Sequence, residues 1–394
     1  MSNRLPARSS AVRTGAISST TRASSSSSAI RIGTGNLTTT LTATPVIRIG
    51  GSRRTVTTTA RAKTTAAAAT AAATAAAAAA AAAANTTTAT PSVVLTEEEV
   101  LFKGLEYLHF DYNRQKKVLR KRNIERFRSN YGVSPLAISK VIIDLQTLLD
   151  EVDRIKKFDI RYFFLTLFWF KAYLKQNQME GPWNICPETI SEKINVYSKA
   201  IQHLKKHKVK WFEDGECDDD DIFLVSVDGI HCRTFEVRRD PGKKWYSHKS
   251  HGAGFAYELA IAIRSGRLVW MNGPFYASKS DITIFRFGDG DEQNPGPNLR
   301  DMIPEGKRAV ADSGYRGEDG KTCSITRQGD SDKVKEFKAR AKSRQEVFNS
   351  KVKAFACTNT EFRHGKKLHG TAFESVCILL QYDMENGYGL LFEI

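Results

Sequence analysis

The first 96 residues of this 394-residue chain contain no aspartate or glutamate, although they include ten lysines and arginines. Large apolar side chains are also scarce there, because the segment consists mainly of Ser, Thr, Ala and Arg. Such a composition buries too little apolar surface to offset the entropy lost on ordering. We therefore expect residues 1–95 to form a disordered low-complexity extension. An acid-free, Arg- and Ser-rich start is also typical of an organellar transit peptide, and this alternative is open.

Paired cysteines and long apolar runs are missing as well. The six cysteines include no CxxC pair, so the sequence predicts reduced thiols in an intracellular protein rather than a disulfide framework or a zinc knuckle. The longest strongly apolar run, residues 162–170, is far shorter than the roughly 20 residues of a membrane span. We expect no transmembrane helix and no membrane partner. The net charge of +16 suits a polyanionic partner without proving one.

Helical signals fill residues 96–212. Thr96 followed by three glutamates is typical of a helix N-cap with acids in the first turn. A cation-rich stretch at 113–130 is separated by a Gly-containing turn from an apolar-periodic stretch at 136–152. This outline is that of a DNA-binding helix-turn-helix, but it is equally that of a packed helical hairpin. The cations of this region that we predict to contact DNA are Lys116, Lys117, Arg120 and Lys121.

Strand signals begin at residue 222. The apolar run 222–227 ends on Asp228, which Gly229 follows at once. A carboxylate at the tip of a core strand is costly to bury unless a cation compensates it. On its own, however, an Asp-Gly pair more often marks an ordinary turn. The strands predicted in this region are 222–230, 232–239, 255–264 and 267–273, the last two as a hairpin around Gly266.

Cations and aromatic side chains alternate in the turn after the second predicted strand. That pattern suits a nucleic-acid backbone with an unstacked base. The alternative is a solvated hairpin tip that binds nothing. The residues of this turn that we predict to contact DNA are Lys243, Lys244, Trp245 and Lys249.

Two more acids stand at ends or faces of predicted elements. The short strand 307–311 ends on Asp312, so a second strand terminates in an acid followed by a turn. Glu346 lies on a helix predicted over 331–355, roughly 150° from the centre of its apolar stripe at about 100° per residue. Asp281, in contrast, reads as a first-turn acid or capping partner of a short helix. Basic candidates for DNA contact near Glu346 are Lys342, Lys353 and Arg363.

Three carboxylates in one place repel one another unless a cation is bound. Mg²⁺ prefers a few carboxylates together with water and phosphate oxygens. Two such ions can activate a water or a 3′-hydroxyl and stabilise the leaving oxygen of an in-line phosphoryl displacement. Asp228, Asp312 and Glu346 therefore predict a site for two Mg²⁺ or Mn²⁺ ions.

The motifs VSVDGIHC, YELAIAI, NGPFYASKSDITIF, ADSGYRG and RQEVFNSKVKAF together resemble the PIF/Harbinger-type DDE transposases, a group of DDE superfamily endonucleases. The resemblance covers about residues 222–385. It implies an α/β fold, with a ribonuclease H-like mixed sheet and flanking helices, in a catalytic domain of residues 213–394. It also maps the three catalytic, metal-binding acids of the family onto Asp228, Asp312 and Glu346.

The same resemblance implies hydrolytic nicking and strand transfer on double-stranded DNA, at element termini and at a target. It further implies a nuclear location, a homo-oligomer and a Myb-like accessory protein. The alternative from a different class is a domesticated, non-cleaving DNA-binding protein derived from a transposase.

Overall fold

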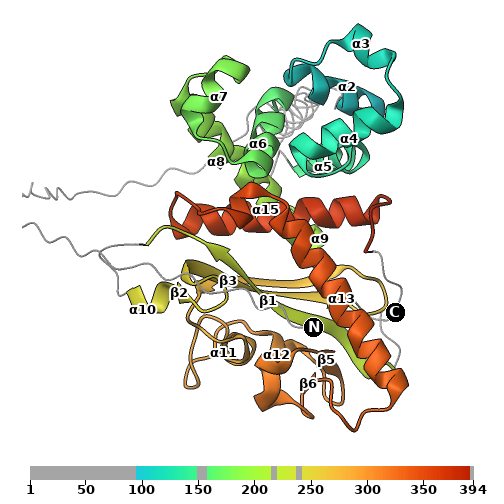
Figure 1. The fold of residues 1–394 in the computed structure, drawn as a ribbon, viewed down its shortest axis with the longest axis vertical. Helices are drawn as coiled ribbons and strands as arrows, with labels where there is room; N and C mark the ends of the chain where they lie inside the picture. The colour runs from blue at the N-terminus through green and yellow to red at the C-terminus, as the bar shows by residue number, and fades with distance from the viewer. Residues whose placement is uncertain (1–94, 149–157, 214–219, 237–241, 391–394) are drawn as a thin grey trace, which may run out of the picture. The chain divides into compact units, whose positions relative to one another are not determined.

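The computed structural model describes residues 95–148, 158–213, 220–236 and 242–390. The extension predicted for residues 1–95 therefore lies almost wholly outside the described residues. Within them the chain is mixed α/β, with a helical first part followed by a six-stranded mixed sheet and its flanking helices (Figure 1). No helix of the described part is long and apolar enough to cross a membrane. The five cysteines it contains are all free thiols.

Local sequence signals fix several helix ends in the first part. The Thr96 side chain accepts a hydrogen bond from the Glu99 backbone in a reciprocal capping box, and the Asp159 side chain caps α6 by accepting one from the Arg161 backbone. Gly132 ends α4 with φ +87°, a backbone conformation that favours glycine. The helices are α2 (Glu97–Tyr107), α3 (Tyr112–Lys116), α4 (Arg120–Tyr131), α5 (Pro135–Leu148), α6 (Ile160–Ala172), α7 (Gln176–Trp183), α8 (Pro187–His203) and α9 (Lys205–Lys208).

The predicted helix–turn–helix forms as α4, a turn at Gly132 and α5. Its second helix, α5, however, packs against two other helices, α2 and α15 (Lys366–Glu385). Helix α5 buries Ile138, Val141 and Leu145 and carries a single cation, Lys140. Lys140 is exposed, and most of the other exposed cations of this region lie on α3 and α4.

The sheet is built around β1, which pairs antiparallel with β3 and parallel with β5. Strand β4 extends the sheet beyond β3 antiparallel, and β6 extends it beyond β5 parallel. Because β1 is central, both of its faces are largely buried, which explains its nearly continuous apolar sequence. The strands are β1 (Phe223–Arg233), β2 (Tyr246–Ser247), β3 (Gly252–Ala262), β4 (Leu268–Tyr276), β5 (Arg308–Val310) and β6 (Cys323–Ser324).

The hairpin predicted around Gly266 is confirmed as β3 and β4, but two other strand predictions are wrong. Residues 222–230 and 232–239 do not form separate strands, because β1 runs without a turn to Arg233. Its pairing with β3 continues from Val225 opposite Ala262 to Arg233 opposite Gly254. The end of the second predicted strand, 237–239, lies outside the described residues.

Helix α13 (Asp332–Lys353) lies along β1 with a polar stripe facing the sheet. Gln345 accepts a hydrogen bond from Ser226 Oγ at 3.1 Å, and Lys353 donates to the His231 backbone oxygen. The apolar stripe predicted for this helix is therefore only partly right. Lys338 and Arg344 are buried as well, and each donates a hydrogen bond to a backbone oxygen. Shorter elements of this region are α10 (Gly242–Trp245), α11 (Asp281–Phe287), α12 (Leu299–Met302), η2 (Ser313–Glu318) and α14 (Ala356–Asn359).

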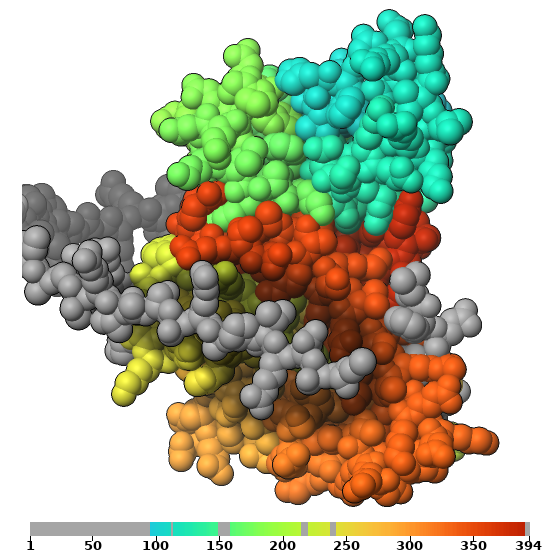
Figure 2. Space-filling model, in the orientation of Figure 1, coloured from blue at the N-terminus to red at the C-terminus, as the bar shows by residue number. Residues whose placement is uncertain are grey.

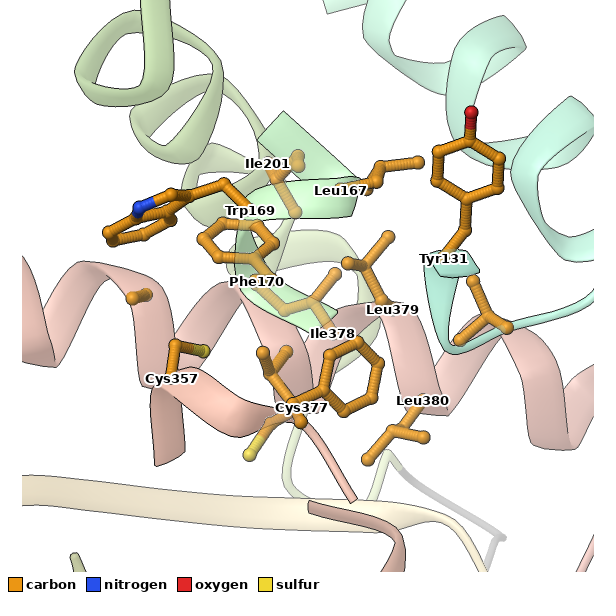
Figure 3. Close-up of a cluster of buried hydrophobic side chains, with 14 of the residues drawn as sticks. Tyr131, Leu167, Trp169, Phe170, Ile201, Cys357, Cys377, Ile378, Leu379 and Leu380 are labelled. Atoms are coloured by element: carbon orange, nitrogen blue, oxygen red, sulfur yellow. The ribbon is translucent and has the colours of Figure 1, made fainter. Parts of the chain in front are cut away.

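One hydrophobic core joins the helical part to the sheet. Helix α15 is buried on nearly all sides and contacts α5 and α8 as well as β4. Figure 2 shows its surface as a red band between the cyan and green helices and the yellow and orange sheet region. The described residues all belong to one compact unit, 88–394, inside which the predicted boundary at 213 falls. Side chains of α4, α6, α8, α14 and α15 meet in this core, among them Tyr131, Trp169, Phe170, Ile201, Cys357 and Ile378 (Figure 3).

Candidate active site

The parallel pairing of β1 with β5 sets the level of the two predicted strand acids. The last paired residues are Ser226 and Val310. Asp228 lies two residues beyond Ser226, and Asp312 lies two residues beyond Val310. Parallel neighbours are about 4.8 Å apart across a sheet, so equal offsets bring both acids to the same end of β5. The sequence prediction that these two acids converge agrees with this register.

Asp228 does not stand in a turn, so the simpler interpretation of its Asp-Gly pair is wrong. It lies in the middle of β1, and Gly229 pairs with Glu258 of β3. The Asp228 Oδ1 atom accepts a hydrogen bond from the Gly229 amide at 2.8 Å, and Oδ2 accepts one from Asn349 Nδ2 of α13 at 2.8 Å. Both carboxylate oxygens are thus held in place by the chain.

Asp281 is the third acid of this cluster; it lies in the first turn of α11, as predicted, but its carboxylate approaches the other acids. Ser280, rather than Asp281, caps α11 by accepting a hydrogen bond from Thr283. The carboxylate of Asp281 instead lies over Gly229, where a Cβ would stand 2.2 Å from its Oδ1 atom. A Cβ on Gly314 would stand 3.1 Å from Asp281 Oδ2 and 3.0 Å from an oxygen of Asp312. Gly229, directly after Asp228, and Gly314, two residues after Asp312, were the sequence signals for this close approach.

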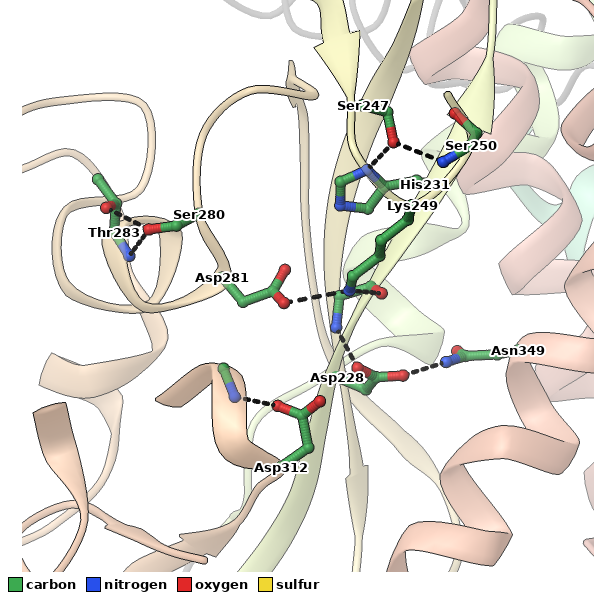
Figure 4. Close-up of polar contacts among 12 residues, drawn as sticks. Asp228, His231, Ser247, Lys249, Ser250, Ser280, Asp281, Thr283, Asp312 and Asn349 are labelled. Atoms are coloured by element: carbon green, nitrogen blue, oxygen red, sulfur yellow. Dashed lines mark hydrogen bonds and ion pairs between the residues drawn. The ribbon is translucent and has the colours of Figure 1, made fainter. Parts of the chain in front are cut away.

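Lys249 supplies the positive charge at the centre of these acids (Figure 4). Its Nζ atom donates to Asp281 Oδ2 at 3.1 Å and to the backbone oxygen of Gly229 at 3.2 Å. The Asp281 side chain is 11% exposed and that of Lys249 is 48% exposed, so the pair lies at the mouth of the site. Lys249 was predicted to contact DNA, and the structure places it among the carboxylates.

Burial and the neighbouring acids raise the pKa of Asp228. Burial raises the pKa of Asp228 to about 6, Lys249 opposes this rise, and the negative charges of Asp281 and Asp312 add to it. For Lys249, burial lowers the pKa, but Asp281 and Asp228 outweigh burial and hold it above its ordinary value. One ammonium therefore compensates the three carboxylates only in part.

A fourth acid, Glu258, is buried beneath the cluster. Its side chain shares a sheet face with Gly229, the residue that Asp281 covers. Trp270 Nε1 donates to Glu258 Oε2 at 3.0 Å, whereas Oε1 has no hydrogen-bond partner. Burial raises the pKa of Glu258 to about 8, and the charge of Asp281 contributes to this rise. The buried hydroxyl of Tyr315 likewise lacks a partner.

Glu346, the third predicted catalytic acid, is exposed on α13, one turn before Asn349. It makes no hydrogen bond or ion pair with any residue that the structure describes. The chain therefore brings Asp228 and Asp312 together with Asp281, while Glu346 stays on the outer face of the helix. Across the described ranges, no group of three His, Cys, Asp or Glu side chains is arranged as a ready-made metal site.

The chemistry of the donor set nevertheless fits a hard divalent cation. Its members present oxygen atoms only, which are the ligands of Mg²⁺ and Mn²⁺. The buried Oδ1 atom of Asn349 has no hydrogen-bond partner, although its amide group donates to Asp228. His231 and Cys232 belong to the packing instead, because Cys232 is buried and His231 Nδ1 bonds Ser247 Oγ at 2.8 Å.

Of the cations predicted to contact DNA around the acids, only some face solvent. Lys243 is exposed, whereas Lys244 lies over the Tyr276 ring at 4.5 Å. Trp245 is 5% exposed and packs against Phe255 and Tyr276, so its predicted role as a stacking surface for a base does not fit its position. An apolar indole between two aromatic rings gains more from burial than from solvent.

The remaining basic candidates divide in the same way. Lys342 donates to Thr326 Oγ1 at 3.1 Å, and Arg363 donates to the Tyr173 backbone oxygen at 2.6 Å while lying over its ring. Lys353 donates a hydrogen bond to the His231 backbone oxygen of β1. The cations at the α3–α4 junction are exposed, and Arg120 pairs with Glu97 at 2.7 Å; the others there are Lys116, Lys117 and Lys121.

No family model, no curated protein and no solved structure matches this chain.

Proposed function

We propose that the protein is a metal-dependent DNA endonuclease of the transposase type, which cleaves phosphodiester bonds and transfers strands. One observation carries this proposal: the β1–β5 register sets Asp228 and Asp312 at equal levels, beside a third carboxylate and a buried amide oxygen. Carboxylates gathered in this way repel one another unless a cation is bound between them. Oxygen-only donors indicate Mg²⁺ or Mn²⁺, with two ions expected for phosphoryl transfer.

The sheet topology supports a ribonuclease H-like assignment within this proposal. Three antiparallel strands, β4, β3 and β1, are followed by two strands parallel to β1. The acids lie on the central strand and just after its parallel neighbour, and a long helix covers that strand. This order suits an acid-bearing ribonuclease H-like sheet with flanking helices.

In the proposed reaction, Asp228 and Asp312 would hold metal, and Glu346 would complete the second ion's ligands. A bound divalent ion supplies an activated water or 3′-hydroxyl and stabilises the leaving oxygen. The chain's own contribution is orientation. Gly229 and Asn349 fix the two oxygens of Asp228, and the Gly314 amide fixes Asp312 Oδ1 at 2.8 Å. Glu346 is exposed on α13, so its side chain would have to turn toward the acids to take this role.

The test is cleavage of DNA bearing inverted terminal repeats by wild type and by Asp228→Asn, with Mg²⁺, Mn²⁺ or EDTA. We expect metal-dependent nicking by wild type and a loss of at least a hundredfold in the variant, because a two-metal site loses a ligand. Asp301→Asn is the matched control, since Asp301 is an exposed acid of α12 whose carboxylate accepts a hydrogen bond from the Asn298 side chain. Equal cleavage by Asp228→Asn and wild type would refute the proposal.

A domesticated, non-cleaving DNA-binding protein is the second candidate, and one observation favours it. Lys249 already pairs with Asp281, so part of the charge is compensated without metal. Such a protein would bind DNA equally in Mg²⁺ and in EDTA, and it would bind no Mn²⁺. Nuclear location, double-stranded DNA as partner, a homo-oligomer and a Myb-like accessory protein remain predictions under either candidate.

A further inference from the structure

We propose that Asp281 is a metal-binding carboxylate of this site and that Lys249 is its resident counter-ion, which a divalent cation must displace. The inference rests on the proposed function, since it concerns the same metal. It goes further by assigning a ligand outside the three predicted acids.

The first support is the space that the chain leaves for Asp281. Any side chain at Gly229 would meet Asp281 alone among its nearest neighbours, at 2.2 Å from Oδ1. Any side chain at Gly314 would lie 3.0–3.1 Å from oxygens of Asp312 and Asp281. Asp228 and Asp312 are thus each followed within two residues by a glycine whose missing Cβ leaves room for the same carboxylate. A helix-capping acid would need neither gap, and Ser280 already caps α11.

The second support is the buried polar atoms around that carboxylate. Glu258 is 1% exposed, its Oε1 atom has no partner, and its side chain lies on the sheet face that Asp281 covers. Asn349 Oδ1 is a second buried oxygen without a partner, on the opposite side of Asp228. Unpaired buried polar atoms are costly, and a cation bound beside the acids, together with its water shell, would give both of them a partner.

The third support is the position of Lys249. Its ammonium lies 3.1 Å from Asp281 Oδ2, whereas a Mg²⁺ ion binds an oxygen at about 2.1 Å. The two cations repel each other at that range, so both cannot hold this oxygen. Because the Lys249 side chain is about half exposed and follows the short strand β2, it can turn outward without disturbing the core.

The experiment is a titration of the metal-free full-length chain with Mn²⁺ in the absence of DNA. Binding is measured by calorimetry and by the electron paramagnetic resonance signal of free Mn²⁺. Variants are Asp281→Asn, Lys249→Gln, Asp228→Asn and Ser280→Ala. We expect Asp281→Asn to bind Mn²⁺ at least roughly tenfold more weakly than wild type, as loss of a partner in a metal site does. Lys249→Gln should bind Mn²⁺ more tightly, because the competing charge is gone.

Ser280→Ala separates a ligand from a helix residue. It removes the cap of α11 but leaves the Asp281 carboxylate, so we expect wild-type affinity. If Asp281 acted only through its helix, Ser280→Ala would weaken binding as much as Asp281→Asn does. A loss of folding cannot imitate the Lys249→Gln result, because misfolding would not tighten binding.

The outcomes distinguish this inference from the proposed function. If wild type binds Mn²⁺ and Asp228→Asn does not, while Asp281→Asn binds as wild type, the inference is refuted and the proposed function stands. Unchanged or weaker binding by Lys249→Gln refutes the counter-ion role. If wild type itself binds no Mn²⁺, both the proposed function and this inference fail.

Discussion

Asp228 lies in the middle of the central strand, and its surroundings explain how a carboxylate is tolerated there. Two hydrogen-bond donors hold its oxygens, and Lys249 lies close enough to lower its pKa against the effect of burial. Asp281 and Asp312 then raise that pKa again. Its pKa of about 6 lies above the ordinary value of an aspartate, and a cation bound to the charged form would lower that pKa.

Glu258 yields a prediction about pH. Its folded-state pKa of about 8 lies above its ordinary value of 4.5, so the folded state holds a proton that the unfolded state releases. The stability from this proton is complete below pH 4.5 and is lost between pH 4.5 and 8, at about 1.4 kcal/mol per pH unit. Glu258→Gln cannot ionise, and its amide oxygen can still accept from Trp270. We expect the variant to be the more stable protein by a margin that grows up to pH 8.

Urea unfolding of wild type and Glu258→Gln at pH 5, 6, 7 and 8 measures this margin. Asp228 contributes a similar loss between about pH 4 and 6, but it does so in both proteins and cancels in the difference. Parallel stability curves for the two proteins would show that Glu258 is ionised in the folded state.

At the scale of elements, an ion pair joins the predicted DNA-binding hairpin to the last helix. Asp383 of α15 accepts from Arg128 of α4 at 2.9 Å and from the Ser134 amide at 2.8 Å. The Asp383 side chain is 1% exposed, so the pair is protected from solvent on that side. The α4–α5 turn is therefore fixed by α15 rather than left free to follow a DNA groove.

Asp383→Ala tests this connection. The change leaves the buried Ser134 amide without a partner and Arg128 without its counter-ion, so we expect a loss of about 3 kcal/mol in the free energy of unfolding. Glu336→Ala is the control, because Glu336 pairs with Arg340 at 2.7 Å on an exposed face of α13, where a loss below about 0.5 kcal/mol is expected. Equal losses in the two variants, measured by urea unfolding, would contradict the role given to Asp383.

How far the sequence predicts these elements depends on whether their signals are local. The cap at Thr96 and the hairpin at Gly266 are local signals, and the corresponding elements form as expected. The continuity of β1 depends on its long-range partner β3, so the turn predicted in it does not exist. Tertiary pairing overrode a local Asp-Gly signal.

The site was predictable to a similar extent. Asp228 and Asp312 were predicted because each ends a predicted strand and is followed by a turn signal. The place of Asp281, in contrast, depends on two glycines distant in sequence. The polar face of α13 was expected to hold Glu346, and the residue that touches Asp228 is Asn349, one turn later. The periodicity of a helix predicts which residues share a face, but it does not predict which of them lies level with a given residue of the neighbouring strand.

At the scale of the whole molecule, the helical part and the sheet share one core through α15. We predict that a fragment of residues 213–394 does not fold cooperatively, because the face of α15 that contacts α5 and α8 would be exposed to water. A fragment of residues 96–394 retains the whole core and is the control. Thermal unfolding and amide exchange compare the two fragments, and a sharp transition in the shorter one would contradict the prediction.

The shared core has a consequence for synthesis of the protein. Helix α8 ends at His203, whereas α15, which covers it, begins only at Lys366. The chain is synthesised from its N-terminal end at about 5–20 residues per second. The apolar faces of α5 and α8 therefore stay exposed for on the order of ten seconds or longer before α15 can pack on them. A nascent chain in that interval exposes the surfaces that chaperones bind, and the acidic site reaches its final form only after α15 has emerged.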